Sequence, residues 1–425
     1  MHESENTKYP DYHIVRYQTN IKNLLNLIQH IYILKQIHFS IREKMKIGIL
    51  TQPLHANYGG LLQNYALQQT IIKAGHEVET IDWGSSSGLR AMLYRMKVRV
   101  LHTLLPNRYP PLRYKPNDKE RAIIQRNTNH FINTYINHTK AIHSYGGFVR
   151  QAARGGYDAY VVGSDQCWRP CYNAFISSMF LDFVQDKQVK RIAYAASFGT
   201  DKWEFTPQQT NVCTPLAKKF NFVTVREDSG VKLCKEHLGV DAEHVLDPTM
   251  LLTKEDYIQL VEKEKEPKSN GTLFNYILDP DAKKSAFIQK VAKAKGLKAF
   301  QVLPKCQTET RTKEDVKNRI EDCVFPGVTT WLRAFMDAEM TIVDSFHGMV
   351  FCIIFNKPFW AIGNVDRGMS RFTSLLKMFH LEDRLLDADH LDDVDFSKPI
   401  DWTKVNGILE EKREECRNLL YKTLS

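Results

Sequence analysis

Residues 344–348 (DSFHG) join a buried strand pattern to an apolar helix pattern, and they contain the best candidate for acid–base chemistry. A histidine donates or accepts protons near neutral pH, so His347 could act as a general acid or base. At a helix N-terminus, Ser345 and backbone amides such as that of Gly348 could bind phosphate or carboxylate oxygens. A lone histidine is more often structural, so the alternative is a packing role for His347.

Three arginines are candidates for binding an anion. Arg226 follows the strand pattern of residues 222–225, and a guanidinium at a strand end can hold a carboxylate or phosphate through two hydrogen bonds. Arg367 and Arg371 lie in residues 366–371 (DRGMSR) and could face the same cleft. The alternative for Arg226 is a structural ion pair with Glu227.

Two further runs follow buried strand patterns and suit a binding cleft. In residues 55–63 (HANYGGLLQ), adjacent glycines let the backbone approach a ligand, although neither a dinucleotide-binding nor a Walker motif is present. In residues 163–168 (GSDQCW), polar groups could bind sugar hydroxyls, the indole could cover a sugar ring, and Asp165 could take a proton from a hydroxyl nucleophile. The alternatives are a packing turn for the first run and a helix cap for the second. Besides Asp165, we predict these cleft residues: Asn57, Tyr58, Gly59, Gly60, Gln63, Ser164, Gln166 and Trp168.

The elements around these runs predict a parallel α/β architecture, because short apolar runs alternate with helical patterns from residue 45 onward. The expected strands form a first series at 46–50, 77–82, 158–163 and 190–197, and a second at 222–225, 243–246, 272–278, 297–303, 340–344 and 358–363. We therefore expect two Rossmann-like domains facing each other across a cleft, each with its own core. They are an N-terminal acceptor-side domain (45–218) and a C-terminal donor-side domain (219–400), and the helix of residues 401–425 packs back on the first.

Residues 1–44 stand apart from this pattern. Leu and Ile are frequent between residues 21 and 41, but Lys22, Asn26 and Lys35 interrupt them, so a membrane-spanning helix is not expected. The segment is either an amphipathic helix or, as we prefer, the product of a mis-assigned start codon, since Met45 opens a natural first strand.

The composition is that of a globular protein, with 43% hydrophobic and 25% charged residues among 425. The net charge of +9 is concentrated between Arg90 and Arg126, where ten basic residues stand against two acidic ones. The rest of the chain is close to neutral, which argues against a general nucleic-acid binder.

Residues 89–114 interleave arginines with apolar residues and suit peripheral contact with an anionic membrane, where a lipid-linked saccharide would be displayed. The alternative is an ordinary solvated helix face.

The cysteines indicate a reducing compartment. Eight are present, none forms a CxxC pair, and no secretory signal precedes them, so we expect a cytoplasmic protein without disulfides. Cys167 and Cys171 have a spacing that could suit a metal on a helix, but no second pair completes a site, and no metal is expected.

Seven runs in this order resemble the polysaccharide pyruvyl transferase family: NYGGLLQNYALQ, GSDQCW, YAASFG, VREDSG, VLDPTMLL, DSFHGMVFCIIFNKPF and SRFTSLLKMFHLEDR, between residues 57 and 384. The resemblance implies a two-domain, glycosyltransferase B-like architecture. It also implies phosphoenolpyruvate as donor, a sugar carrying a pyruvate ketal as product, and no cofactor.

Carried over by position, the resemblance makes His347 the general acid/base and Arg226 a ligand of the phosphoenolpyruvate anion. It places Asn57, Gly59, Gly60 and Gln63 at the border of the cleft, and Asp165 and Gln166 on the acceptor side. Some members have an arginine two places before the histidine, where this chain has Ser345. A second cation for the donor must then come from elsewhere, and Arg371 and Arg367 are the candidates.

The sequence thus predicts a cytoplasmic transferase, peripheral at the inner face of the membrane, that moves pyruvyl from phosphoenolpyruvate to a sugar of a surface polysaccharide precursor. The first alternative is a nucleotide-sugar glycosyltransferase of the same architecture, although no nucleotide pocket is apparent. The second is a non-catalytic carbohydrate-binding protein. The joint presence of His347, Arg226 and Asp165 counts against this second alternative.

Overall fold

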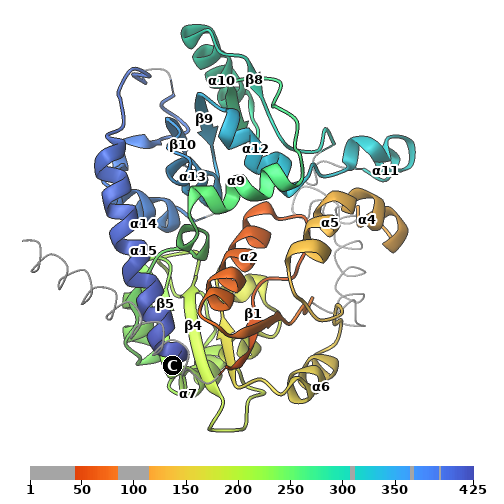
Figure 1. Ribbon diagram of the computed structural model, residues 1–425, viewed down its shortest axis with the longest axis vertical. Helices are drawn as coiled ribbons and strands as arrows, with labels where there is room; N and C mark the ends of the chain where they lie inside the picture. Colours follow the sequence, from red (N-terminus) through yellow and green to blue (C-terminus); the bar gives the residue numbers. More distant parts are fainter. Residues whose placement is uncertain (1–43, 85–113, 307–311, 364–367, 392–393) are drawn as a thin grey trace, which may run out of the picture. The chain divides into compact units, whose positions relative to one another are not determined.

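Two parallel β-sheets with flanking helices make up the fold (Figure 1). The computed structural model describes residues 44–84, 114–306, 312–363, 368–391 and 394–425. The first sheet has the strand order β2-β1-β3-β4-β5-β6, and the second has the order β11-β10-β9-β7-β8. Neighbouring strands in both sheets run parallel. The expected α/β class with two Rossmann-like sheets is confirmed.

In the first sheet, each pair of parallel strands needs a crossover, which the helices supply. Its strands are β1 (Lys46–Leu50), β2 (Glu77–Thr80), β3 (Ala159–Val162), β4 (Lys190–Ala196), β5 (Phe222–Val225) and β6 (Glu243–His244). The accompanying helices are α2 (Tyr58–Lys73), α4 (Asp118–Ile124), α5 (Arg126–Tyr135), α6 (Tyr145–Gly155), α7 (Pro207–Ala217) and α8 (Asp228–Leu233), with short turns η1 (Pro170–Tyr172), η2 (Ile176–Phe180), η3 (Cys234–Leu238) and η4 (Pro248–Leu251).

The second sheet is smaller and is also wrapped by helices. Its strands are β7 (Leu273–Tyr276), β8 (Ala299–Phe300), β9 (Met340–Val343), β10 (Phe359–Ile362) and β11 (Leu385–Leu386). The helices of this half are α9 (Lys254–Lys263), α10 (Ala282–Lys295), α11 (Lys313–Asn318), α12 (Val328–Asp337), α13 (Phe346–Ile354) and α14 (Ser370–Met378), with short turns η5 (Ile320–Cys323) and η7 (Glu382–Arg384). The last helix is α15 (Trp402–Leu424).

The strands β5 and β6 correct the expected division of the chain. They were placed in the second series, but β5 pairs with β4 and β6 pairs with β5, so both extend the first sheet. The chain enters the second sheet only at β7. An apolar run identifies a buried strand but does not indicate which strand pairs with it, because all strands of a parallel sheet covered on both faces have similar composition. Arg226, which follows β5, and Asp165, which follows β3, therefore lie at the edge of the same sheet.

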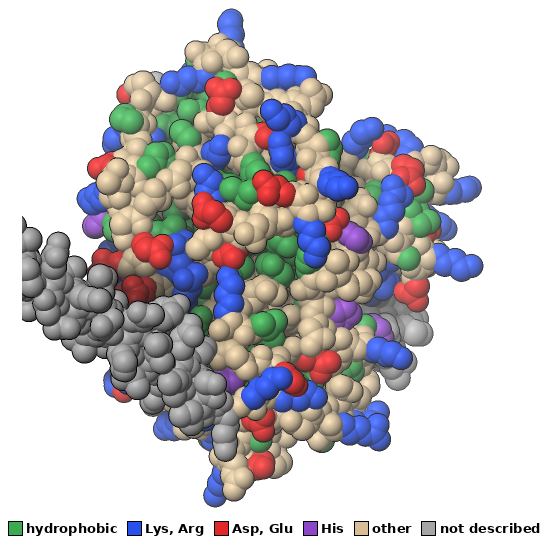
Figure 2. Space-filling view, in the orientation of Figure 1, with side chains coloured by type: hydrophobic (Ala, Val, Ile, Leu, Met, Phe, Trp, Pro, Cys, Tyr) green, Lys and Arg blue, Asp and Glu red, His purple; other side chains and the backbone are tan. Residues whose placement is uncertain are grey.

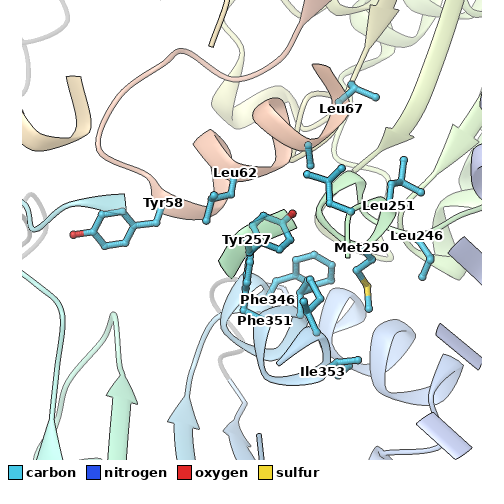
Figure 3. Close-up of a cluster of buried hydrophobic side chains, with 14 of the residues drawn as sticks. Tyr58, Leu62, Leu67, Leu246, Met250, Leu251, Tyr257, Phe346, Phe351 and Ile353 are labelled. Carbon is cyan, nitrogen blue, oxygen red and sulfur yellow. The ribbon is translucent and has the colours of Figure 1, made fainter. Parts of the chain in front are cut away.

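A buried hydrophobic cluster joins the two halves (Figure 3). We call it the apolar joint, and it combines residues of α2, of the β6–η4 segment, of α9 and of α13: Tyr58, Leu62, Leu67, Leu246, Met250, Leu251, Tyr257, Phe346, Phe351 and Ile353. All of them are at most 4% exposed. They belong to one contiguous cluster that includes strands of both sheets. The expectation of a separate core for each half is therefore incomplete, because the largest core is shared.

Helix α15 lies along the side of the molecule and contacts the end of the first sheet (Figure 1). Arg413 Nε donates to the carbonyl of Met250, and Arg417 Nε donates to that of Leu251, both at 2.8 Å. Near its C-terminal end, the carbonyl of Thr423 accepts from Lys190 Nζ of β4 at 3.4 Å. The helix therefore ties η4 to β4.

Charged side chains of both signs are interspersed over the face shown in Figure 2. The basic stretch that suggested membrane contact lies almost entirely outside the described residues. Within the described part of the chain, no helix combines the length and the apolar character needed to cross a bilayer.

Candidate active site

His347 lies in the first turn of α13, directly after the end of β9, and is 9% exposed. Ser345 is the N-cap of this helix, and its hydroxyl oxygen accepts a hydrogen bond from the Gly348 amide at 3.1 Å. The amide of Gly348, which we expected to bind the donor, is therefore satisfied within the helix. The Ser345 hydroxyl keeps its hydrogen for donation toward the cavity that it lines.

The first turn of α2 lies against one edge of the His347 ring. A β-carbon at Gly59 would overlap Nδ1 and Cγ of His347, so only glycine fits at this position. Asn57 caps the same helix, since its side-chain oxygen accepts from the Gly60 amide at 3.2 Å. Two runs far apart in the sequence thus meet at the imidazole, one from each half of the molecule.

Asp247 faces the other edge of the His347 ring. Its Oδ2 lies 3.6 Å from Nε2 of His347, slightly beyond hydrogen-bond length, and Nε2 has no hydrogen-bond partner among the described residues. Burial acts to raise the pKa of Asp247, but His347 and Arg226 outweigh it and hold this pKa well below its usual value. Asp247 is therefore a carboxylate at neutral pH. A carboxylate beside a histidine orients the ring and stabilises the imidazolium formed on proton uptake.

Arg226 lies behind this pair and is 3% exposed. Its guanidinium contacts three carboxylates, with Asp247 at 2.9 Å, Glu227 at 3.3 Å and Asp165 at 3.5 Å. It also stacks over the ring of Phe346, 4.3 Å from the ring centroid. Burial alone would lower the pKa of Arg226, but the carboxylates raise it, Glu227 most strongly. The ion pair with Glu227 that we gave as the alternative is thus present, and Arg226 does not line the cavity described below.

Asp165 follows β3 in a left-handed backbone conformation, with φ of 62°. Its Oδ1 accepts from the Gln166 amide at 2.9 Å, and the residue is 6% exposed. Burial alone would raise the pKa of Asp165, but the positive groups around it, Arg226 foremost, lower it. An ionised carboxylate with a lowered pKa accepts hydrogen bonds well but is a weak base, so Asp165 is better suited to orient a hydroxyl than to hold its proton.

Arg371 at the start of α14 completes the group, and it is 8% exposed. Burial, and then the charge of Arg226, lower the pKa of Arg371 to about 10, so it remains a cation at neutral pH. We call these residues the ionic centre: Asp165, Arg226, Glu227, Asp247, His347 and Arg371. With a neutral imidazole, three carboxylates face two guanidinium groups.

A cavity of about 440 Å³ opens beside the ionic centre. This volume lies within the range of about 300–1,000 Å³ that is typical of small-molecule sites. The cavity is lined from both halves of the molecule. The predicted site residues among its lining are Asn57, Tyr58, Gly59, Asp165, Gln166, Ser345, His347 and Arg371. Gly60, Gln63, Ser164, Trp168, Arg226 and Gly348 are not among the lining residues, and Arg367 lies outside the described residues.

Trp168 does not have the expected role of covering a sugar. Its ring is 0% exposed, stacks on Phe180 with centroids 4.8 Å apart, and donates from Nε1 to the Met179 carbonyl at 2.9 Å. The expectation was wrong because an aromatic residue near a strand end can turn into the core as readily as into a cleft. Sequence alone does not give that direction.

Gln63 and Ser164 are also fully buried and support the loop after β3 instead of lining the cleft. The Ser164 amide donates to Gln63 Oε1 at 2.9 Å, and Gln63 Nε2 donates to Thr51 at 2.8 Å. The Ser164 hydroxyl donates to the Ala195 carbonyl at 3.0 Å. These bonds fix the position of Asp165 relative to α2, so they correct the direct acceptor contact expected for both residues.

The residues that sequence reasoning missed include Asp247 and, among the cavity-lining residues, Arg121 and Tyr172. Asp247 directly follows the expected strand of residues 243–246, so the strand-end rule that singled out Asp165 would have found it. Arg121 lies on α4 and Tyr172 in η1, and neither position follows a strand end. Among the described residues, no cluster of His, Cys, Asp and Glu could hold a metal ion.

Comparison with solved structures finds distant likenesses. A UDP-GlcNAc 2-epimerase from Methanocaldococcus jannaschii matches with a TM-score of 0.42 at 10% identity, covering 87% of this chain and 93% of that chain. The glycosyltransferase SsfS6 from Streptomyces sp. SF2575 matches with a TM-score of 0.37 at 10% identity, covering 88% and 96%. At these values the topology of the two sheets, and not the likenesses, supports the fold assignment.

Comparison with curated protein sequences finds no match. The family model described as polysaccharide pyruvyl transferase matches residues 57–367, which is most of the chain and includes Gly59, Asp165, Asp247 and His347. The chain therefore belongs to the polysaccharide pyruvyl transferase family.

Proposed function

We propose that this protein transfers the pyruvyl group of phosphoenolpyruvate to a sugar of a surface polysaccharide precursor and forms a ketal. The observation that carries the proposal is the position of His347, held between Gly59 and Asp247 beside a cavity that also contains Arg371 and Asp165. This arrangement combines a group that can transfer a proton, a cation for an anionic donor and an acceptor of hydroxyl hydrogen bonds. Family membership supports the same reaction.

In the proposed reaction, His347 donates a proton to the methylene carbon of phosphoenolpyruvate, which makes C2 electrophilic. One sugar hydroxyl, oriented by Asp165, bonds to C2. The C2–O bond to phosphate breaks with its electron pair, and a second hydroxyl closes the ketal. Of the two hydroxyl protons, one restores His347 and the other leaves with phosphate. Asp247 stabilises the imidazolium of His347 before it donates its proton and after it regains one.

The donor anion needs more than one cation, and Ser345 stands where some family members have an arginine. We propose that Arg371 and Arg121 hold the donor, because both line the cavity. Arg121 is half-exposed, and the side chain of its ion-pair partner Asp118 is 96% exposed. Exchanging that partner for a ligand therefore costs little free energy. Arg226 does not line the cavity and instead holds Asp165 and Asp247 in position through ion pairs. A direct donor contact would require it to release one of these carboxylates.

Thermal unfolding with phosphoenolpyruvate tests this proposal, since a ligand that binds the folded state raises the midpoint. We expect the parent and His347→Ala to be stabilised, and Arg371→Ala and Arg121→Ala to lose most of the shift. Arg154→Ala, an exposed arginine on α6, is the matched control and should retain it. No shift with phosphoenolpyruvate together with a clear shift from UDP-glucose would replace this proposal with a nucleotide-sugar glycosyltransferase.

We further propose that the protein works in the cytoplasm on a lipid-linked acceptor and contacts the anionic membrane through residues 89–114. The support is the charge pattern of that segment, where Arg95 and Arg99 alternate with apolar residues. Sedimentation with vesicles of phosphatidylcholine and phosphatidylglycerol tests it. Arg95→Ala/Arg99→Ala should weaken binding, and equal binding by both proteins, or none by the parent, would contradict it.

A further inference from the structure

A second cavity of about 510 Å³ adjoins the first. The two share four lining residues: His55, Arg121, Gln125 and Tyr172. All other lining residues of the second cavity also come from the first half of the chain, between Gln52 and Met179. Most of the lining residues lie in the segments after β1, β2 and β3, so the second cavity extends the cleft along the carboxyl edge of the first sheet.

Aromatic rings give the second cavity its character. Tyr172 and Phe175 line it and are 52% and 36% exposed, which makes them two of the few large hydrophobic residues at the surface of the described structure. Trp83 lines it too, at 9% exposure. Exposed aromatic faces that gather in one cavity mark a binding surface, because they lose water when a ligand covers them.

The exposed rings are held in place from behind. Phe175 stacks on Tyr145, with centroids 5.3 Å apart and an angle of 18° between the rings. The Arg169 guanidinium lies 5.3 Å from the Tyr172 ring centroid, and Arg169 is itself paired with Glu204 at 2.9 Å. Rings fixed in this way lose little conformational entropy on binding, so the surface is preorganised for a ligand.

The polar lining of the second cavity suits a neutral ligand with hydroxyl groups. It contains the carboxylate of Asp82 and the side chains of Gln52, Asn173 and His143, together with Arg121, which is shared with the first cavity and which we assign to the donor there. Burial raises the pKa of Asp82, and its Oδ1 accepts from the Leu54 amide at 3.3 Å. A half-buried carboxylate disfavours a phosphate or a second carboxylate nearby. Ring faces together with a carboxylate and amides match a saccharide, which has apolar faces and an equator of hydroxyls.

We propose that the second cavity binds the saccharide unit next to the sugar that receives the pyruvyl group, so the acceptor is an oligosaccharide of at least two units. The inference rests on the proposed function for the position of the reacting sugar in the first cavity. Tyr172, shared by both cavities, lies where the two sugar units meet. Tyr172 and Phe175 then select the second unit through contact with its apolar faces.

A glycan array printed with matched pairs tests the proposal, with each monosaccharide beside disaccharides that carry it at the non-reducing end. The parent should bind at least one disaccharide about tenfold or more tightly than its terminal monosaccharide. Tyr172→Ala and Phe175→Ala should abolish that preference, and Tyr172→Phe should keep it. Val212→Ala, at an exposed residue of α7, is the control and should behave as the parent. Both aromatic positions are exposed, so the variants should fold.

Phosphoenolpyruvate-dependent stabilisation, measured on the same proteins, separates the two proposals. If that stabilisation is intact but no saccharide binds, or the preference survives both alanine variants, the second cavity is not a saccharide subsite. If the disaccharide preference is lost in Tyr172→Ala while phosphoenolpyruvate has no effect on the parent, the subsite stands and the donor proposal fails.

Discussion

The apolar joint and the ionic centre both lie where the two halves of the molecule meet, and both are buried, but burial has opposite consequences in them. In the joint, side chains such as Leu62, Met250 and Phe351 gain free energy by leaving water (Figure 3). In the ionic centre, Arg226 and its carboxylates lose hydration on burial, and only their mutual contacts offset the free energy of that loss. Phe346 connects the two, because it packs in the joint and its ring lies against the Arg226 guanidinium of the centre.

The comparison indicates that stability and chemistry are separated at this interface. The joint can hold the halves together with any well-packed apolar residues, whereas the centre works only with particular groups at particular distances. A buried charged group kept at such cost is a candidate for function more than for stability. Variants in the two regions should therefore differ in what they impair.

The largest effect should come from His347. His347→Ala should lower pyruvyl transfer by about 10²–10⁴-fold, because it removes the group that exchanges protons with the donor, while the midpoint of thermal unfolding changes little. Gly59→Ala should give a comparable loss of activity, since the new β-carbon would displace the imidazole of His347. Activity and unfolding measured on both variants check this. Retention of activity by His347→Ala would separate His347 from the chemistry, and retention by Gly59→Ala would mean that the imidazole keeps its position beside a β-carbon.

Arg226→Met should follow, with a loss of about 3–5 kcal/mol in the free energy of unfolding, because Asp165, Glu227 and Asp247 would remain buried without their cation. Urea unfolding measures the loss, and Arg154→Met supplies the exposed control. A stability equal to the parent would mean that the carboxylates do not depend on Arg226.

Leu62→Ala in the apolar joint should cost about 2–5 kcal/mol in the same measurement, since it removes a fully buried side chain of α2. The folded variant should keep its thermal shift with phosphoenolpyruvate and most of its activity. Loss of the thermal shift in Leu62→Ala would show that the joint and the centre do not act separately.

The sequence predicted the elements better than their neighbours. Strand runs such as residues 340–344 were found because a strand buried on both faces is continuously apolar, and Ser345 and His347 were correctly placed at the start of the next helix. Strand β5 was assigned to the wrong sheet because strand pairing depends on contacts that are distant in the sequence. For the same reason, neither the contact of Gly59 with His347 nor the inward direction of Trp168 could be read from spacing.

The smallest effect concerns pH and sharpens the comparison without disturbing packing. The pKa of Asp247 is lowered in the folded protein, whereas an unfolded aspartate has a pKa of about 3.9. The unfolded state therefore binds more protons in acid, so the stability that Asp247 contributes is complete above about pH 4 and is lost as the pH falls toward the pKa of Asp247 in the folded protein.

Urea unfolding between pH 3 and 6 should show a shallower decline of the free energy of unfolding toward acid for Asp247→Asn than for the parent. Asp201→Asn, at an exposed position, should leave the slope unchanged, and so should Leu62→Ala, because the apolar joint has no group that titrates in this range. An identical slope for parent and Asp247→Asn would mean that the carboxylate is not held ionised by the centre.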